Sequence, residues 1–175
     1  MSSGQVVSWA REVLIAPLSV VIVILIRLIR PILLVRFGRL SARRMGHLAW
    51  NTEFYACERD VTESSSSVDV FCWYPPVANQ QLLKMWRRSL HVSRWVAPLW
   101  RYNRLIPGGG AHDVIMGMDR YEYARRLLEE TNVHLRFTEE EEEFGLKSLD
   151  QMGIQPDDEF ICLHVRDGAY LAQEF

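Results

Sequence analysis

A long apolar run near the N-terminus is the most prominent feature of the hydrophobic pattern. Residues 13–26 are all apolar or small except for one serine, and two arginines and a proline separate them from a second apolar run, residues 32–35. A helix that crosses a bilayer needs about 20 apolar residues, so the first run alone is short. The pattern favours a membrane-associated helix within residues 1–38, either a short or re-entrant anchor or a helix lying in the interface. The alternative is a helix buried in the core.

Beyond this run, helical and strand periods alternate. Residues 37–40 are either a short strand or the end of the anchor. One helix is predicted to begin near Leu48, and another to lie within residues 91–106. Asn79 is the expected N-cap of a helix over 80–90, and Asp119 is the expected N-cap of a helix over 119–130. A last helix begins at Thr138, where Glu141 completes a capping box. The predicted strands are 68–74, 133–137 and 160–171. Strands that alternate with helices predict an α/β fold, a Rossmann-like layer with a mainly parallel sheet.

The last predicted strand, residues 160–171, carries the most suggestive chemistry. His164 and Arg166 are two positions apart, so on a strand they project from the same face, and Asp167 begins a turn. Ligands of open α/β sheets bind at the carboxyl ends of strands, and arginine grips phosphate in bidentate fashion. The alternative is a surface pair of Arg166 with Asp167, and a structural core histidine.

A second candidate site lies at the start of the helix that begins near Leu48. Gly46 would lie at or just before the helix N-terminus, where exposed N–H groups and the helix dipole attract an anion. Arg44 and His47 flank that point. The alternative is a basic cluster beside the membrane followed by an ordinary glycine turn.

Residues 91–106 are dense in tryptophan and arginine. Such interleaving fits nucleic-acid binding or sugar stacking on indole faces, but a half-buried helix with snorkelling arginines is favoured. The glycine run 108–110 lacks the Lys-Ser/Thr of a phosphate-binding loop, which leaves a mobile active-site loop or a plain linker. His112 and Asp113, which follow it, could form a polar pair in a cleft.

Charge and cysteine usage exclude several classes. Residues 1–47 hold seven arginines and one glutamate, so with a net charge of −2 the other 128 residues carry −8, which disfavours a nucleic-acid binder. Arginine excess after the apolar run predicts a chain at the cytoplasmic face of the inner membrane. The cysteines (Cys57, Cys72 and Cys162) lack metal-ligand spacing and read as buried thiols in a reducing compartment. The glutamates of 139–143 are predicted to be the solvated first turns of a helix, so no metal site is expected there. Apolar residues from Phe144 to Met152 are predicted to form the inward face of that helix.

Two blocks of residues resemble a known family. The segment Cys162-Leu163-His164-Val165-Arg166-Asp167 with Tyr170-Leu171, and the earlier segment 44–51 with Arg44, Gly46, His47 and Asn51, are similar to the marked segments of an uncharacterised bacterial family of glycosyltransferase-like proteins. The match covers roughly residues 40–171. More distantly, the His-x-Arg strand resembles that of fucosyltransferases with two Rossmann-like lobes, the GT-B arrangement. Asp167 stands where those enzymes commonly have a second arginine, so the resemblance does not identify the donor sugar.

The resemblance implies a fold and a set of site residues. Residues 39–155 would be the first lobe of a GT-B-like fold, and 156–175 the first strand of a second lobe whose remainder is missing, which would leave this fragment inactive alone. His164 and Arg166 would bind the nucleotide-sugar donor, with Arg44, Gly46 and Asn51 facing them from the first lobe. Asp167, His47 or Asp113 would serve as general base. No metal and no cofactor is implied, the nucleotide-sugar being a co-substrate.

Together these features predict a membrane-associated glycosyltransferase that acts on a saccharide or lipid-linked saccharide of the bacterial envelope. The alternative is a non-catalytic, membrane-anchored α/β module that scaffolds partners through its tryptophan- and arginine-rich segment. A small nucleotide-binding hydrolase is disfavoured, because no Walker or nucleophile-elbow motif is present.

Overall fold

The computed structural model describes residues 3–62, 66–116, 121–155 and 157–163. These residues fall into two compact units, Met1–Arg136 and Phe137–Phe175. The predicted donor residues His164 and Arg166, and Asp167 with them, lie outside the described residues.

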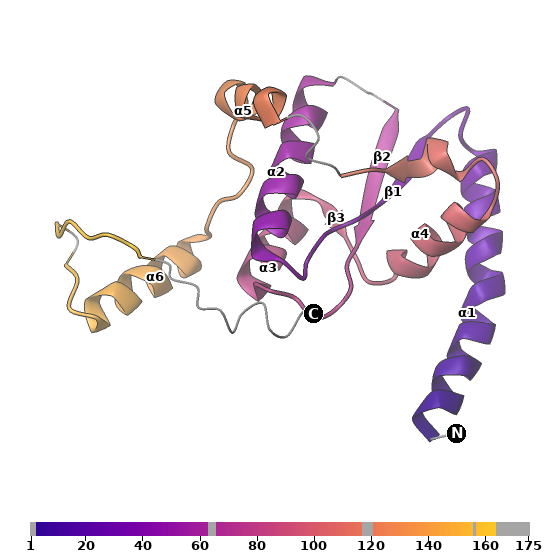
Figure 1. Ribbon diagram of the computed structural model, residues 1–175, viewed down its shortest axis with the longest axis horizontal. Coiled ribbons are helices and arrows are strands. Elements are labelled where there is room, and N and C mark those ends of the chain that lie inside the picture. Colours follow the sequence, from indigo (N-terminus) through magenta and orange to yellow (C-terminus); the bar gives the residue numbers. More distant parts are fainter. Residues whose placement is uncertain (1–2, 63–65, 117–120, 156, 164–175) are drawn as a thin grey trace. The chain divides into compact units, whose positions relative to one another are not determined.

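The first unit is built on a four-stranded sheet in which all strand pairs are parallel (Figure 1). The strands are β1 (Leu34–Arg39), β2 (Ser67–Cys72), β3 (His91–Val92) and β4 (Asp113–Val114). Their spatial order is β3-β2-β1-β4, so the first strand lies inside the sheet and the chain changes direction beside it. The predicted α/β class and parallel, Rossmann-like sheet are therefore confirmed.

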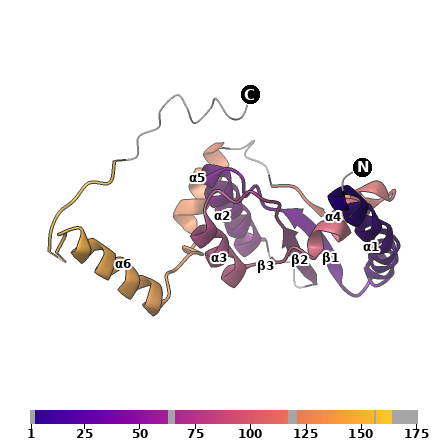
Figure 2. The same ribbon diagram turned by 90° about the horizontal axis from the view of Figure 1, so that it is seen from below.

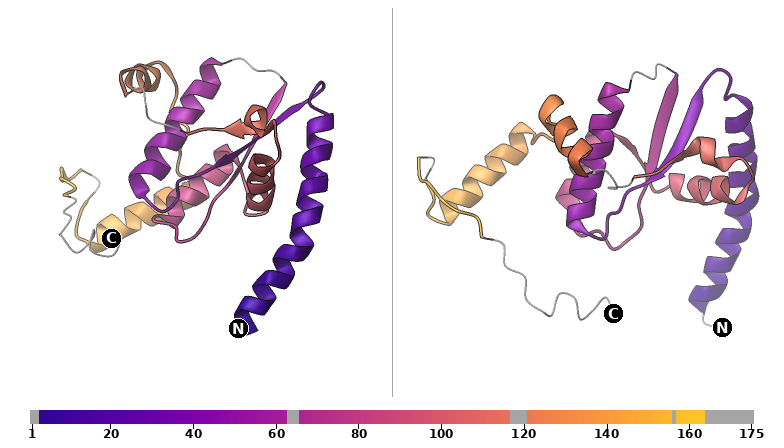
Figure 3. Two further views of the ribbon diagram at one scale, coloured as in Figure 1. Left: turned by 45° about the vertical axis from the view of Figure 1, so that its right-hand side comes forward. Right: turned by 45° about the horizontal axis from the view of Figure 1, so that its top comes forward.

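Helices cover both faces of this sheet. The helices of the first unit are α1 (Ser3–Leu28), α2 (Met45–Val61), α3 (Gln80–Ser89), α4 (Val96–Leu105) and α5 (Tyr121–Glu130), with a short 3₁₀ helix η1 (Gly109–His112). Seen from below, α2 and α3 lie on one side of the strands and α4 and α1 on the other, while α5 packs outside α2 (Figure 2). The same layers are visible in the right-hand view of Figure 3.

The main core lies between the sheet and the α2–α3 layer. Trp86 of α3 is fully buried there with Leu48 and Phe71, and its indole N–H donates to the Leu48 carbonyl at 2.9 Å. Gly38 of β1 is needed in this core because a Cβ at that position would lie 2.4 Å from the Phe71 ring. The core therefore ties the start of α2 to the sheet and to α3.

The helix α1 packs one face against α4 and leaves another exposed. Ser19, Val23 and Arg27 lie on the packed face at helical spacing, whereas Leu18, Leu25 and other apolar side chains are exposed. No helix among the described residues has both the length and the hydrophobicity needed to cross a membrane. Residues 34–38 of the predicted membrane-associated segment belong to β1, and the membrane association of α1 stays a prediction.

Arg27 fastens the end of α1 to the end of α4. Its guanidinium donates to the Asn103 carbonyl at 2.8 Å, to Asn103 Oδ1 at 2.9 Å and to the Pro107 carbonyl at 2.7 Å. Gly109 is needed beside this contact, because a Cβ there would lie 2.1 Å from the Asn103 oxygen. Gly109 is thus packed against the end of α4 and begins η1, so the predicted linker is in part a short helix, and an active-site role for the segment stays a prediction.

His112 and Asp113 do not form the polar pair considered from the sequence. The buried His112 contacts the Val35 carbonyl through Nδ1 at 2.6 Å, while Asp113 Oδ2 lies 3.5 Å from Arg104 Nε. Each side chain is committed to a different neighbour, because the residues occupy successive positions at the entry to β4.

Substitution of Arg27 by alanine is expected to loosen α1, because three carbonyls at the end of α4 lose a charged donor. Hydrogen bonds to charged groups contribute about 1.5–3 kcal/mol, so stability should fall by about 2 kcal/mol. Limited proteolysis and hydrogen exchange should show α1 opening before the rest of the unit. Arg30→Ala, at an exposed position just beyond α1, is the control. Equal proteolysis of the two variants would contradict this role for Arg27.

Two predicted strands are not found. Residues 133–137 form no strand, because Ser89 Oγ and an Arg88 guanidinium nitrogen donate to the carbonyls of His134 and Arg136. That segment is held by side chains of α3, and the prediction is wrong. Residues 160–163 also form no strand, and Ile161 is 94% exposed. From residue 164 the predicted strand lies outside the described residues.

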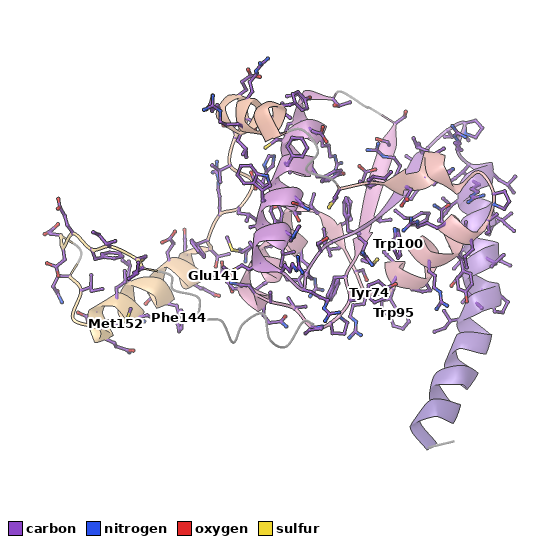
Figure 4. All side chains as sticks on the ribbon, viewed as in Figure 1. Tyr74, Trp95, Trp100, Glu141, Phe144 and Met152 are labelled. Atoms are coloured by element: carbon purple, nitrogen blue, oxygen red, sulfur yellow. The ribbon has the colours of Figure 1, made fainter. Side chains whose placement is uncertain are left out.

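The second unit contains α6 (Glu139–Gln151). Its predicted capping box is confirmed, since Thr138 Oγ1 accepts from the Glu141 N–H and the Glu141 carboxylate accepts from the Thr138 N–H. No side chain of α6 is buried by the described residues, and Phe144 and Met152 stand exposed on the helix (Figure 4). The apolar side chains from Phe144 to Met152 that were predicted to face inward are therefore not buried by the described residues.

Candidate functional site

The carboxyl edge of the sheet gathers aromatic and cationic residues. Because the strands are parallel, their carboxyl ends meet at one edge, where open α/β sheets bind ligands. Trp73 and Tyr74 come directly after β2, and Arg94 and Trp95 lie between β3 and α4. Figure 4 shows Tyr74, Trp95 and Trp100 close together at this edge.

These residues enclose a pocket, here called the aromatic pocket. It has a volume of about 380 Å³ and is lined by Trp73, Tyr74, Arg94, Trp95 and Ala97. Trp95 is 75% exposed, which leaves most of its indole in solvent, and Tyr74 is also partly exposed. The pocket offers flat apolar surfaces beside a guanidinium with five hydrogen-bond donors.

Two arginine side chains pack against the Trp100 ring beside the pocket. The Arg39 and Arg104 guanidinium groups lie 5.2 and 5.1 Å from the centre of the Trp100 ring, within cation–π range. Tyr74 meets Trp100 edge to face with ring centres 6.4 Å apart. These contacts hold Trp100 and Tyr74 in place at one side of the pocket.

Burial changes the acid–base behaviour of this edge. It raises the pKa of the Tyr74 phenol, and the neighbouring Cys72 adds to the rise. Burial also raises the pKa of the Cys72 thiol to about 12. Both groups are therefore neutral near pH 7, and Tyr74 presents a hydroxyl donor to the pocket.

The start of α2 lies at the same edge. The prediction that Gly46 marks a helix N-terminus is confirmed, since α2 begins at Met45. Arg44 occupies the N-cap position and its guanidinium cannot accept a hydrogen bond, so it cannot cap the first-turn N–H groups. Nothing lies within 4 Å of where a Cβ on Gly46 would stand. The backbone here is open to an approaching anion.

The predicted general base His47 and the predicted donor-site residue Asn51 lie one helical turn apart on α2. Asn51 Nδ2 is 3.3 Å from His47 Nδ1, and Asn51 is buried while His47 is exposed. Within the described part of the chain, Asn51 Oδ1 has no hydrogen-bond partner. The structure thus brings His47 and Asn51 together and places Arg44 and Gly46 beside them at the start of the helix.

Backbone contacts join the start of α2 to the loop that carries Tyr74. The Ala78 N–H donates to the Ala42 carbonyl at 2.8 Å, so the segments that follow β1 and β2 run against each other. The Asn79 side chain caps α3 by accepting from the Leu82 N–H at 2.8 Å. The predicted anion site and the aromatic pocket therefore belong to one edge built from neighbouring loops.

A larger cleft, of about 770 Å³, lies over the C-terminal half of α2 and the β1–β4 pair. Its central charges are already matched: Arg36 donates twice to the Asp69 carboxylate at 2.6 Å, and the Tyr55 hydroxyl donates to the same carboxylate. The hydrogen bond to Asp69 raises the pKa of Arg36, while burial, followed by that contact, raises the pKa of Tyr55. The Arg36–Asp69 contact in this cleft is a structural ion pair, so the carboxyl edge is the better candidate for a functional site.

No family model, curated protein or solved structure matches this chain.

Sequence reasoning found part of this edge. The tryptophan- and arginine-rich segment 91–106 was predicted mainly as a half-buried helix, which describes α4 but not the exposed Trp95 that precedes it. That segment did not include Trp73 and Tyr74. They were predicted as the last residues of the strand 68–74, and that end position was the available signal, because the carboxyl ends of strands form the ligand-binding edge of a parallel sheet.

Proposed function

We propose that this chain is the first lobe of a GT-B-like glycosyltransferase and that its aromatic pocket binds a sugar ring of an envelope saccharide. The observation that carries the proposal is the pocket of Trp73, Tyr74 and Trp95 beside Arg94 at the carboxyl edge. The flat C–H faces of a sugar ring stack on indole rings. The sugar hydroxyls accept hydrogen bonds from arginine. The proposed reaction class comes from the resemblance of the segments 44–51 and 162–171 to glycosyltransferase-like proteins.

The start of α2 supports a neighbouring site for the nucleotide-sugar donor. Its first-turn N–H groups and the nearby Arg44 favour an anion such as a diphosphate. The resemblance implies His164 and Arg166 as further donor-site residues, and both lie outside the described residues. Arg44, Gly46 and Asn51 complete the donor site.

The proposed reaction is a simple displacement. An acceptor hydroxyl oxygen attacks the anomeric carbon, the bond from that carbon to the diphosphate oxygen breaks, and a general base takes the hydroxyl proton. His47 or Asp167 serves as the base, whereas Asp113 is already engaged by Arg104. Arginine and helix N–H groups stabilise the negative charge on the leaving diphosphate. Neither a metal nor a cofactor takes part in the proposed chemistry.

The test is a change at the most exposed ring of the pocket. Trp95→Ala is expected to weaken saccharide binding about tenfold or more, because stacking on an aromatic ring contributes about 1–3 kcal/mol. Calorimetric titration with envelope oligosaccharides and nucleotide-sugars measures the change, and Trp95→Phe should restore much of the affinity.

Leu105→Ala is the matched control, since Leu105 is also exposed on the same segment but does not line the pocket. Equal saccharide affinity in Trp95→Ala and the unaltered chain would contradict the proposal. If no saccharide binds and a protein partner depends on Trp95 instead, the scaffold alternative is favoured.

We also propose that α1 associates with the inner membrane at its cytoplasmic face, lying in the interface. The supporting observation is the row of exposed apolar side chains on the face that does not contact α4. The row on α1 consists of Leu18, Val21, Ile24, Leu25 and Leu28, and the exposed Ile29 and Ile32 follow in the turn after the helix. Arg30, exposed in that turn, suits anionic head groups.

Vesicle binding tests the membrane proposal. Leu25→Glu should lower binding to vesicles of mixed neutral and anionic phospholipid about tenfold or more, because an inserted leucine side chain contributes about 1.5–3 kcal/mol. Ile115→Glu, at an exposed apolar position away from α1, should bind as the unaltered chain does. Equal loss in both variants, or no binding by the unaltered chain, would contradict it.

A further inference from the structure

Three side chains that commonly ligate transition metals converge on the outer side of α2. Glu53 and Cys57 are four residues apart, so they share one face of the helix. His134 reaches that face from the segment after α5, and its Nδ1 lies 2.8 Å from Glu53 Oε1. One ligand atom from each residue lies within 4.8 Å of the other two. This cluster is separate from the carboxyl-edge pocket.

The surroundings of the cluster limit access of water. Cys57 is fully buried and packs with Phe54 and Leu127 between α2 and α5. The side chains of Glu53 and His134 are only 19% and 17% exposed. Glu53 and His134 already pair with each other across this enclosed space, and the Cys57 thiol lies beside them. A shared cation would replace that pair and engage the thiol as well.

A fourth residue orients the imidazole. Asp60, on the same helix, places Oδ2 3.0 Å from His134 Nε2, the ring nitrogen that does not face Glu53. Histidines that bind metal through one nitrogen usually donate from the other to a carboxylate, which fixes the ring and strengthens the ligand. The outer hydrogen bond of a metal-bound histidine is therefore already in place.

We propose that Glu53, Cys57 and His134 bind a zinc ion, with Asp60 positioning His134. Oxygen, sulfur and nitrogen donors suit zinc and do not suit magnesium or calcium, which prefer oxygen alone. On binding, the Cys57 thiol releases its proton and the hydrogen bond between Glu53 and His134 gives way to two metal bonds, with water in the fourth position. The ion would tie α2 to the segment after α5.

Spacing rules could not find this site. They look for ligands close in sequence, whereas Glu53 and His134 are 81 positions apart. Burial raises the pKa of the Cys57 thiol, so the thiol is protonated until a divalent cation displaces the proton. Affinity should consequently fall as pH falls.

Cobalt(II) added to the full chain is the probe. A four-coordinate site with a thiolate ligand gives intense visible bands and a near-ultraviolet charge-transfer band, and zinc should displace both. Cys57→Ser should abolish the charge-transfer band. Cys72→Ser, buried elsewhere, and Cys162→Ser, exposed, are matched controls that should retain it.

Two further variants guard against loss of folding. His134→Gln, at a partly exposed position, should lower cobalt affinity by about tenfold or more, and Asp60→Asn by about 10–100-fold with the charge-transfer band intact at saturation. Circular dichroism confirms that each variant is folded. Absence of a charge-transfer band in the unaltered chain, or a band that survives in Cys57→Ser and disappears in Cys162→Ser, would overturn the proposal.

Discussion

Replacing Asp69 with alanine is expected to lower the free energy of unfolding by about 3 kcal/mol. Asp69 is only 1% exposed, and its carboxylate accepts two hydrogen bonds from Arg36 and one from Tyr55. Removal of the carboxylate leaves a guanidinium and a phenol without their partner between β1, β2 and α2. The Arg36 side chain is 34% exposed, so water recovers part of the loss. This places the effect at the low end of the range for breaking a buried ion pair.

Urea denaturation followed by circular dichroism measures this change, and a second aspartate provides the control. Asp113 also pairs with an arginine, but its contact with Arg104 is 3.5 Å and more than half of the Arg104 side chain is exposed. Asp113→Ala should therefore cost less than about 1 kcal/mol. If the two alanine variants lost the same stability, the Arg36–Asp69–Tyr55 cluster could not be the structural ion pair that the large cleft contains.

Trp86→Ala is expected to cost about 3–5 kcal/mol, the usual range for truncating a large buried aromatic. Trp86 is fully buried between α2, α3 and the sheet, and its indole N–H satisfies the Leu48 carbonyl. The alanine variant opens a cavity and leaves that carbonyl without its donor. Because Leu48 lies in the first turns of α2, the start of α2 should lose its fixed position too.

Two tryptophan variants separate these contributions. Trp86→Phe keeps most of the ring volume and should cost about 1–2 kcal/mol, mainly for the lost hydrogen bond. Trp95→Ala removes a ring that is mostly in solvent and should change stability by less than about 0.5 kcal/mol. Thermal unfolding of the set measures the order, and a larger loss for Trp95 than for Trp86 would contradict the described core.

Local signals in the sequence predicted much of the fold. Asn79 and Thr138 cap the helices that they were expected to cap, because capping depends on residues within one turn. The parallel sheet followed from strands that alternate with helices. The segment 133–137 was wrongly predicted as a strand, because its β-rich composition does not reveal that side chains of α3 donate hydrogen bonds to its carbonyls. Such contacts join residues more than 40 positions apart, beyond any local pattern.

The candidate site was predictable only where one element defines it. Gly46 and His47 were placed correctly because both belong to the start of one helix. The aromatic pocket combines residues after β2 with residues between β3 and α4, so it depends on the strand order β3-β2-β1-β4. Composition showed the tryptophans, but the fold decides which of them share a pocket.

The central claim is that a sugar ring binds at the carboxyl edge of the sheet. The indole N–H signals of the six tryptophans, recorded by nuclear magnetic resonance on isotope-labelled protein and assigned by substitution, test it most directly. On addition of envelope oligosaccharides or nucleotide-sugars, the signals of Trp73 and Trp95 should shift while that of the buried Trp86 stays in place. Saccharides that leave the Trp73 and Trp95 signals unchanged at every concentration would contradict the account.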